Sequence, residues 1–267
     1  MIRAIVAGAF GRMGTAVIGF IDSTPGIELA GALEREGHPQ LGQALVRRGG
    51  SEAPPVRVTS RFEDLPDDVD VLIDFTTPEA TLRNLETCAE AGICAVIGTT
   101  GLNGEQKEAL AIFAGRTPTV FAPNMSVGVN LLFQLAATAA AALGDDYDVE
   151  IIEAHHRMKK DAPSGTALRL AEIVAEALGR DLEKQAVYAR HGMIGERTVE
   201  EIGIQTVRAG DIVGEHTLLL AGTGERIELT HRAHSRDNFA RGAVRAALWV
   251  ADRAPGLYSM ADVLGLK

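Results

Sequence analysis

The sequence is poor in cysteine and in basic residues. Two cysteines among 267 residues, Cys88 and Cys94, exclude a disulfide framework and a cysteine-rich zinc site. Lysine and arginine number 26 against 36 acidic residues, which gives a formal net charge of −10 at pH 7. This balance argues against nucleic acid and against an anionic membrane as the partner, unless the basic residues gather in one patch.

Long hydrophobic runs are also missing, because no stretch reaches ~18 uninterrupted apolar residues, and this argues against a transmembrane helix. The segment Met1–Gly8 leads directly into a strand-like run and lacks the charged region, apolar core and cleavage site of a secretory signal. We therefore expect a cytoplasmic protein in a reducing compartment, with no membrane partner.

Glycine is in clear excess, with 29 residues in a chain that is only 4% aromatic. These glycines follow no collagen-like or low-complexity period, so we expect them to serve tight turns and close approaches of the backbone. The length of 267 residues suits one large domain or two modest ones, and it allows a sizeable core without disulfides or metals.

The first half of the chain alternates short apolar runs with helical patterns. Strands are predicted at 2–7, 27–33, 69–75, 93–97 and 119–122, and helices at 12–21, 82–91 and 104–114. This alternation predicts an α/β domain of Rossmann-like type, with a parallel sheet and helices on its faces. We interpret 36–55, which is rich in glycine, proline and charge, as a loop or irregular helix.

The pattern changes after about residue 126. Helices are predicted at 129–143, 165–178 and 239–250, and strands at 147–154, 202–207, 213–220 and 226–230. Strands in succession, with few helices between them, predict an α+β domain with an antiparallel or mixed sheet. The sequence therefore predicts two domains, with a boundary near 124–130.

A glycine-rich turn follows the first predicted strand and opens the first helix. Gly8, Gly11 and Gly14 give the spacing G-x-x-G-x-x-G, a variant of the G-x-G-x-x-G dinucleotide fingerprint. Glycines let backbone N–H groups approach a pyrophosphate at the positive end of the helix. Glu34 follows Gly14 by 20 residues, at the place where an acidic residue takes the ribose hydroxyls. We favour dinucleotide binding, although helix–sheet packing alone can explain such a turn.

Arg35 directly follows Glu34. A carboxylate favours a free 2′-hydroxyl and a guanidinium favours a 2′-phosphate, so the pair predicts tolerance of both NADH and NADPH. The alternative is that Arg35 is a solvated loop residue. Two later turns, Gly98–Gly101 and Ala122–Met125, end predicted strands and should lie at the same ligand-binding edge of the sheet, although ordinary turns use the same residue types.

A basic segment, His155–Lys160, holds two histidines, one arginine and two lysines. It precedes a turn, Pro163–Thr166, that opens a predicted helix. The N–H groups of this helix start, with the hydroxyls of Ser164 and Thr166, can hold a carboxylate. The alternatives are a solvated loop and a plain N-cap.

The paired histidines do not indicate a metal site, because no cysteine or carboxylate-rich partner motif is near and the adjacent cations repel a metal ion. Histidine titrates near neutral pH, so a general acid is the better chemical match.

From Glu150 to Ala167 the sequence matches the signature E-x-x-E-x-H-H-x-x-K-x-D-x-P-S-G-T-A. At these residues it resembles the 4-hydroxy-tetrahydrodipicolinate reductases (dihydrodipicolinate reductases) of the diaminopimelate route to lysine. The resemblance also covers 8–14, 32–37, 74–76, 96–101, 126–130, 207–216 and 246–249.

The resemblance implies a dinucleotide-binding domain, 1–126 with 236–267, and a substrate-binding and oligomerisation domain, 127–235. It also implies reduction of a cyclic imine dicarboxylate by NADH or NADPH, with release of water, in a homotetramer. Hydride addition and loss of water both need an acid, which His155 and Lys159 can supply.

The resemblance further implies the roles of particular residues. His155 is the expected proton donor and acceptor, and Lys159 a second proton donor. The expected substrate-binding residues are His156, Ser164, Gly165 and Thr166. The expected cofactor-binding residues are Gly8, Ala9, Phe10, Gly11, Arg12, Met13, Glu34, Arg35, Gly98, Thr99, Thr100, Ala122, Pro123, Asn124 and Met125.

The sequence departs from the expected family pattern at Met125, where many members should have Phe beside the nicotinamide. Either side chain can cover an apolar ring face, so the role of this one stays open. Two alternative functions remain. One is another two-domain dehydrogenase of amino-acid precursors, but a phosphorylating semialdehyde dehydrogenase needs a nucleophilic cysteine in its catalytic region, and Cys88 and Cys94 lie in the first domain. The other is a dinucleotide-sensing module without an acid cluster.

Overall fold

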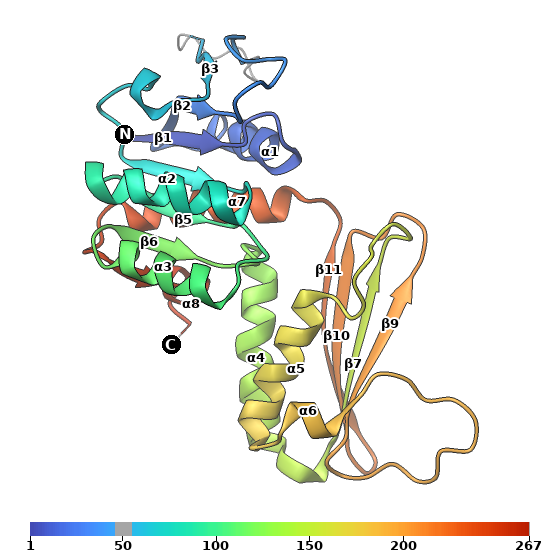
Figure 1. The fold of residues 1–267 in the computed structure, drawn as a ribbon. Helices are drawn as coiled ribbons and strands as arrows, with labels where there is room; N and C mark the ends of the chain where they lie inside the picture. The colour runs from blue at the N-terminus through green and yellow to red at the C-terminus, as the bar shows by residue number, and fades with distance from the viewer. Residues whose placement is uncertain (46–54, 267) are drawn as a thin grey trace. The chain divides into compact units, whose positions relative to one another are not determined.

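The structure is a computed structural model that describes residues 1–45 and 55–266. The chain divides into two compact units, each with its own sheet (Figure 1). Unit 1 consists of Met1–Val127 and Arg236–Lys267, and unit 2 of Gly128–Ser235.

Unit 1 is built on a seven-stranded sheet in the order β12-β6-β5-β4-β1-β2-β3. The strands are β1 (Ile2–Ala7), β2 (Ile27–Leu33), β3 (Val58–Thr59), β4 (Val71–Asp74), β5 (Cys94–Ile97), β6 (Pro118–Phe121) and β12 (Gly256–Tyr258). Every adjacent pair is parallel. The carboxyl ends of these strands therefore share one edge, where ligands bind in open α/β sheets.

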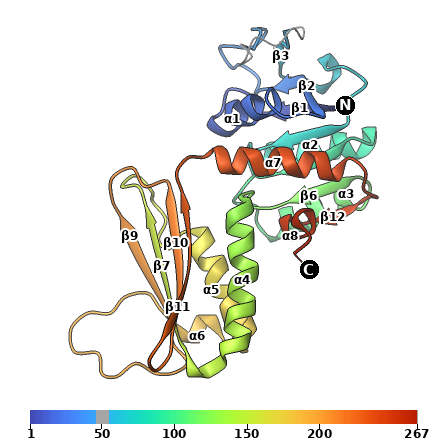
Figure 2. The same ribbon diagram turned by 180° about the vertical axis from the view of Figure 1, so that it is seen from behind.

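Helices cover both faces of this sheet, as Figures 1 and 2 show from opposite sides. The helices α1 (Arg12–Ile21), α7 (Asp237–Val250) and α8 (Met260–Leu264) pack on one face, and α2 (Pro78–Ala91) and α3 (Gly104–Ala114) on the other. On the first face, α1 buries Val17 and Ile21 against Ala243 and Ala247 of α7 and the sheet.

Local sequence signals explain where helices of unit 1 begin and end. Thr77 caps α2 by accepting from the N–H of Ala80, and Pro78 occupies the first turn. Gly92, with φ 72°, ends the helix in the left-handed region. Asn103 and Gln106 form a capping box at the start of α3.

Unit 2 has a five-stranded sheet in the order β11-β10-β7-β9-β8. The strands are β7 (Asp148–His155), β8 (Ala186–Val187), β9 (Ile202–Arg208), β10 (Gly214–Ala221) and β11 (Arg226–Ala233). The strand β10 is antiparallel to its neighbours β7 and β11, whereas β9 is parallel to β7 and β8. The sheet is mixed.

Two long helices cover one face of the unit 2 sheet, namely α4 (Val127–Leu143) and α5 (Gly165–Leu178), and a short helix, α6 (Leu182–Gln185), follows. Their apolar stripes, with Ala136 of α4 and Leu170 of α5, bury Ile151 and Ile204 of the sheet. This α+β arrangement, together with the parallel sheet of unit 1, confirms the predicted fold class.

Most predicted elements match, and the differences concern short or capped ones. The strand β4 covers Val71–Asp74 where 69–75 was expected, and α2 begins at Pro78 rather than at 82. The predicted loop 36–55 lies partly outside the described residues, and within 36–45 there is no helix, only a bridge from Ala44 to Arg57.

One segment of the described chain, Val127–Asp146, is long and apolar enough to cross a membrane by length and composition. The uninterrupted apolar run sought in the sequence is a stricter criterion. In the structure, Leu132, Ala136 and Ala140 of this segment are buried in the core of unit 2, whereas Leu131 and Leu135 are exposed, and 22% of the apolar window is buried inside the protein.

Candidate active site

The turn between β1 and α1 is shaped by glycine. Gly8 has a φ of +71°, a conformation that L side chains rarely adopt. A Cβ on Gly14 would lie 2.1 Å from the carbonyl oxygen of Gly8, so only glycine fits there. Gly11 is the N-cap of α1, and no side chain of the described residues caps this helix. The first N–H groups of α1 are therefore suited to hold an anionic ligand.

The carboxylate of Glu34 is tied to this turn. Its Oε2 accepts from the N–H of Phe10 at 3.2 Å, and its Oε1 accepts from the N–H of Arg35 at 3.0 Å. These bonds place the carboxylate beside the glycine-rich turn at the end of β2, where it can still accept bonds from hydroxyls. Arg35 itself is exposed.

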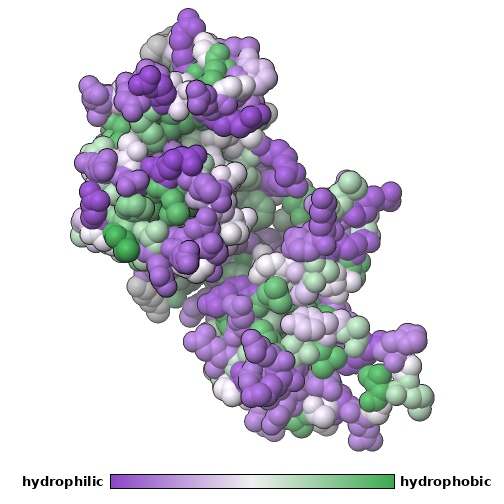
Figure 3. All heavy atoms as spheres, viewed as in Figure 1, coloured by the Kyte–Doolittle hydropathy of each residue, from purple (hydrophilic) through white to green (hydrophobic). Residues whose placement is uncertain are grey.

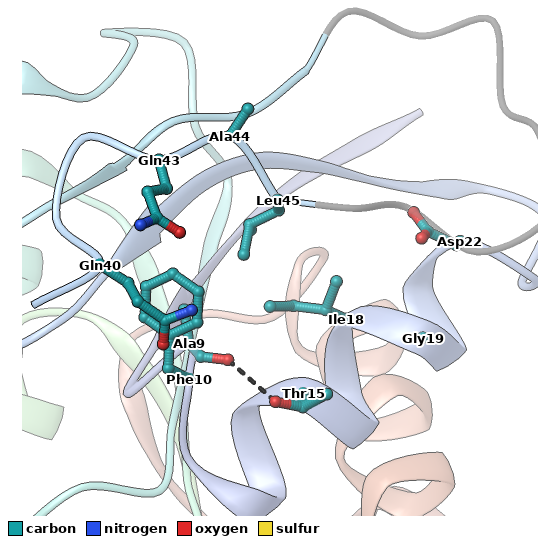
Figure 4. A pocket seen from close by; sticks show the side chains of 10 residues that line it. All are labelled: Ala9, Phe10, Thr15, Ile18, Gly19, Asp22, Gln40, Gln43, Ala44 and Leu45. Carbon is teal, nitrogen blue, oxygen red and sulfur yellow. Dashed lines mark hydrogen bonds between the residues drawn. The ribbon is translucent and has the colours of Figure 1, made fainter.

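A cavity of about 230 Å³ lies beside the same turn (Figure 4). Its lining residues are Ala9, Phe10, Thr15, Ile18, Gly19, Asp22, Gln40, Gln43, Ala44 and Leu45. Thr15 donates to the carbonyl oxygen of Ala9 at 3.3 Å, and the ring of Phe10 stacks on His38 with centroids 5.1 Å apart. Of the predicted cofactor residues, the cavity includes Ala9 and Phe10.

At the carboxyl end of β4, the fully buried carboxylate of Asp74 accepts hydrogen bonds from several hydroxyl groups. Oδ1 of Asp74 accepts from the hydroxyls of Thr76 at 2.6 Å, Thr81 at 3.2 Å and Thr99 at 3.3 Å. Thr99 is only 2% exposed. Its hydroxyl is therefore engaged inside unit 1, and Thr99 can offer a cofactor its backbone rather than its side-chain oxygen. Thr100 is exposed.

The turns after β5 and β6 are closely packed. A Cβ on Gly98 would lie 2.1 Å from the ring of Phe75, so any larger residue there would have to displace that ring. Met125 is 1% exposed and belongs to the hydrophobic core. A Cβ on Gly242 of α7 would lie 1.8 Å from the carbonyl oxygen of Met125, so α7 closely approaches this backbone. Asn124 accepts from the N–H of Ser126 at 2.9 Å.

The remaining predicted cofactor residues lie in the same two regions. Arg12 and Met13 belong to the first turn of α1, Arg12 exposed and Met13 half-buried. Ala122 is buried and Pro123 exposed in the turn after β6.

Unit 2 holds the predicted proton donor on the face of the sheet that α4 and α5 cover. Glu153 and His155 are two residues apart on β7, so both side chains lie on this face. His155 Nδ1 is 2.5 Å from Oε2 of Glu153. Glu153 is completely buried, and His155 is 9% exposed.

The buried Glu153 carboxylate is held by three further residues. Arg208 of β9 donates from both terminal nitrogens, each at 2.9 Å. The N–H of Ser164 donates to Oε1 at 3.0 Å and the hydroxyl of Thr206 at 3.3 Å. Burial raises the pKa of Glu153, but the hydrogen bonds from Arg208 and His155 outweigh burial and hold the pKa below its ordinary value.

Two histidines in this cluster favour the neutral state. Burial lowers the pKa of His155, although the hydrogen bond and the charge of Glu153 oppose this effect. Burial lowers the pKa of His216 to about 3, and the neighbouring His155 adds to the shift. The two rings meet edge to face, with centroids 5.2 Å apart.

The start of α5 adjoins the same cluster. The Oγ of Ser164 accepts from the N–H of Ala167 at 3.2 Å and lies 3.1 Å from Nε2 of His216. Ser164 is therefore the N-cap of α5, and its buried hydroxyl is engaged within unit 2. Gly165 is exposed and Thr166 half-buried at the first positions of the helix.

The basic segment is partly solvated. Arg157 and Lys160 are exposed, whereas His156 and Lys159 are half-buried. Lys159 Nζ donates to both carboxylate oxygens of Asp161, at 2.9 and 2.8 Å. This hydrogen bond holds the pKa of Asp161 below its ordinary value. Among the described residues no group of three His, Cys, Asp or Glu could hold a metal ion.

Three members of the cluster, Glu153, Arg208 and His216, had no role predicted from the sequence. The position of Glu153, two residues before His155 on a predicted strand, was a usable signal because strand residues i and i+2 share a face. Arg208 and His216 come from other strands, and only the pairing of β9 and β10 with β7 brings them in.

Comparison with known proteins adds family matches over both units. Residues 2–125 match the family model described as "Dihydrodipicolinate reductase, N-terminus", and residues 128–264 match "Dihydrodipicolinate reductase, C-terminus". Curated 4-hydroxy-tetrahydrodipicolinate reductases from Syntrophotalea carbinolica and Syntrophobacter fumaroxidans are 57% and 56% identical over 267 residues, the whole of both chains in each case.

A solved structure is also similar. It is a dipicolinate-bound dihydrodipicolinate reductase from Paenisporosarcina sp. TG-14, 27% identical, with a TM-score of 0.78 over 98% of each chain.

Proposed function

The chain belongs to the dihydrodipicolinate reductase family, and from this premise we propose which of its residues carry out the reaction. It is an NAD(P)-dependent oxidoreductase of lysine biosynthesis through diaminopimelate. It reduces 4-hydroxy-tetrahydrodipicolinate, a dicarboxylate, to tetrahydrodipicolinate with release of water. NADH or NADPH supplies the hydride when bound.

Three observations support the fit of such a cofactor to unit 1. Within the described part of the chain the start of α1 has no side-chain cap, and the Gly8–Gly14 turn has no room for a Cβ at its last glycine. The Glu34 carboxylate is tied to the N–H of Phe10 and can accept from ribose hydroxyls. We assign the turn and the first residues of α1 to the pyrophosphate, and Glu34 with Arg35 to the adenosine ribose.

The nicotinamide end is assigned to the turns after β5 and β6, the residues 98–100 and 122–125. They follow neighbouring parallel strands at the carboxyl edge of the sheet. Because the Thr99 hydroxyl is engaged with Asp74 and Met125 is in the core, backbone groups of these turns make the polar contacts in our proposal.

The substrate site is assigned to the start of α5 with the basic segment. The first N–H groups of a helix, at Gly165 and Thr166, attract a carboxylate, and His156 and Lys159 add donors and positive charge. The Paenisporosarcina enzyme was solved with dipicolinate, a planar dicarboxylate, which supports a site of this kind.

The acid is assigned to His155, with Lys159 as a second donor. One observation carries this assignment: Glu153 accepts from both His155 Nδ1 and the N–H of Ser164, so the acid and the helix start are fixed to one buried carboxylate. Reduction of an imine dicarboxylate needs a proton donor and a group that binds the carboxylates, and His155 beside the start of α5 supplies both. A bound dianion also raises the pKa of His155 and so favours its protonated form.

Substitution of the two acids tests the assignment. We expect His155→Ala and Lys159→Ala to lower kcat by about 10²- to 10⁴-fold each, the usual contribution of a general acid. The affinity for NADH should stay within about threefold, because the cofactor contacts are assigned to unit 1. Steady-state rates with both cofactors, together with fluorescence titration of NADH, give the comparison. Unchanged turnover in both variants would remove these residues from the chemistry.

We also propose a cytoplasmic homotetramer that acts without nucleic acid or membrane partners. The segment between β8 and β9 exposes Tyr188, Met193, Ile194 and Val199, and Figure 3 shows hydrophobic residues on this projecting loop. Exposed apolar side chains gathered on one segment are typical of a surface that another chain covers. The net charge of −10 supports the exclusion of nucleic acid.

A further inference from the structure

We propose that Glu153 is a positioning residue for catalysis: its carboxylate holds the proton of His155 on Nδ1 and leaves Nε2 as the nitrogen that exchanges a proton with the substrate. The inference rests on the proposed role of His155 as the acid. It concerns a fully buried residue that does not itself touch the substrate.

The carboxylate is held rigidly enough for this task. It accepts five hydrogen bonds from four residues: His155, Ser164, Thr206 and Arg208, the last through two nitrogens. A carboxylate with these donors cannot turn without breaking several bonds at once. The orientation of Oε2 toward Nδ1 is therefore fixed by the fold of unit 2 and does not depend on the substrate.

The bond also determines the tautomer. An ionised carboxylate only accepts, and Arg208 helps to keep Glu153 ionised, so the atom at 2.5 Å, Nδ1, must carry a proton. Neutral His155 then has its lone pair on Nε2, and the imidazolium has its transferable proton there. Without a partner on Nδ1, both tautomers would be available to the ring.

Space is reserved on the opposite side of the ring. A Cβ on Gly214 of β10 would lie 3.0 Å from Nε2 of His155. Any residue larger than glycine at this position would crowd Nε2, while Glu153 occupies the Nδ1 side. The two residues together define which edge of the imidazole is used.

Several charged or titratable groups face His155 in the described part of unit 2: Glu153 on its own strand, Arg208 of β9, His216 of β10 and Lys159 of the basic segment. The carboxylate raises the pKa of His155, and the cations lower it. A neutral amide at 153 removes the opposing charge, so the pKa of His155 must fall further. If the imidazolium is the donor, kcat declines as pH rises through this pKa, and the decline moves to lower pH.

The test compares Glu153→Gln with Glu150→Gln in the complete enzyme. Glu150 is a matched control because it is also on β7 and paired with arginines, Arg190 and Arg197, but does not contact His155. We expect Glu153→Gln to lower kcat by about 10²-fold with KM within about threefold, and to move the alkaline limb of the kcat profile to lower pH. Glu150→Gln should keep the rate and the profile. A Glu153→Gln enzyme with the wild-type kcat and pH profile would overturn the inference.

His155→Ala, measured in parallel, separates the two claims. If His155→Ala keeps wild-type turnover, the proposed acid is wrong and the inference falls with it. If His155→Ala loses turnover while Glu153→Gln keeps it, the role of Glu153 alone is wrong.

A measurement on the wild-type protein covers the case in which Glu153→Gln does not fold. Nitrogen NMR of ¹⁵N-histidine-labelled enzyme reports which imidazole nitrogen carries the proton. We expect neutral His155 to be protonated at Nδ1. A signal from the Nε2-protonated tautomer would overturn the inference.

Discussion

At the scale of single residues, the site of unit 2 is built around a charge that the protein has to compensate. Moving a carboxylate out of water costs several kcal/mol, and this cost is met only when the geometry of its partners is good. Glu153 meets that condition through the two-pronged bond from Arg208 and the backbone N–H of Ser164. The residues that stabilise the ionised Glu153 carboxylate also orient it toward His155.

Removal of Arg208 should therefore be costly. Arg208→Met leaves Glu153 buried without its cation, and we expect it to lower the free energy of unfolding by about 3 kcal/mol. Arg232→Met, at an exposed pair with Glu215, should cost less than about 1 kcal/mol. Urea unfolding measures both variants. Equal decreases in the free energy of unfolding would mean that the buried Arg208–Glu153 pair stabilises the protein no more than an exposed pair does.

His216 links stability to pH. Its pKa in the folded protein is about 3, below the ordinary 6.5. Between these two pH values the unfolded state therefore binds a proton on His216 that the folded state does not bind. The contribution of His216 to the free energy of unfolding is therefore most favourable above about pH 6.5. The free energy of unfolding falls as the pH drops from there toward the folded pKa, by up to about 1.4 kcal/mol per pH unit. His216→Gln removes this dependence. Free energies of unfolding between pH 6.5 and 4.5 should fall less steeply in the variant, and parallel curves would contradict the assignment.

Contacts of this kind were beyond prediction from the sequence for a definite reason. The sequence indicates acid chemistry beside an anion site, because a histidine, a lysine and a Ser-Gly-Thr turn lie close together in the chain, at His155, Lys159 and Ser164–Thr166. Arg208 reaches Glu153 across 55 residues, and only the register of β7 with β9 aligns them. The engaged hydroxyls of Ser164 and Thr99 likewise depend on partners in other elements.

At the scale of elements, long segments with clear periodicity were predictable and short ones were not. The bounds of α1, α3 and α5 agree with the sequence prediction. The helices α1 and α5 each have an apolar stripe, and α3 and α5 begin at the capping residues Asn103 and Ser164. The strands β3, β8 and β12 have two or three residues and exist only because a longer neighbour pairs with them. No local sequence pattern predicts such a short strand.

The glycine-rich turn supplies a prediction at this scale. In Gly14→Ala, the new Cβ would lie 2.1 Å from the carbonyl oxygen of Gly8, so the turn before α1 must open. We expect NADH affinity to fall by at least about tenfold, since backbone N–H groups bind a pyrophosphate only in a fixed geometry. Gly104→Ala, at the start of α3 with nothing near its Cβ, is the control and should bind NADH normally. Unchanged affinity in Gly14→Ala would remove the turn from the cofactor site.

At the scale of the whole molecule, unit 1 is assembled from two distant stretches of chain. The strand β12 pairs with β6, and α7 packs on α1, so the C-terminal segment completes the dinucleotide-binding fold that the first 127 residues begin. Family matches over 2–125 and 128–264 cover both units, which agrees with a reaction that needs a cofactor site and a proton donor.

The proposed assembly is open to a direct check. Light scattering after size-exclusion chromatography should give a mass four times the 28.3 kDa of one chain. Met193→Asp with Ile194→Asp places charge on the exposed apolar loop of unit 2 and should reduce that mass. A wild-type protein that elutes as a single chain would contradict the proposed tetramer.

This chain reduces 4-hydroxy-tetrahydrodipicolinate with a nicotinamide cofactor. The most direct measurement follows the nicotinamide absorbance after the purified enzyme is mixed with NADH or NADPH and the product of dihydrodipicolinate synthase. We expect a loss of absorbance that depends on the substrate and is abolished or greatly slowed by His155→Ala. No loss with either cofactor would contradict it.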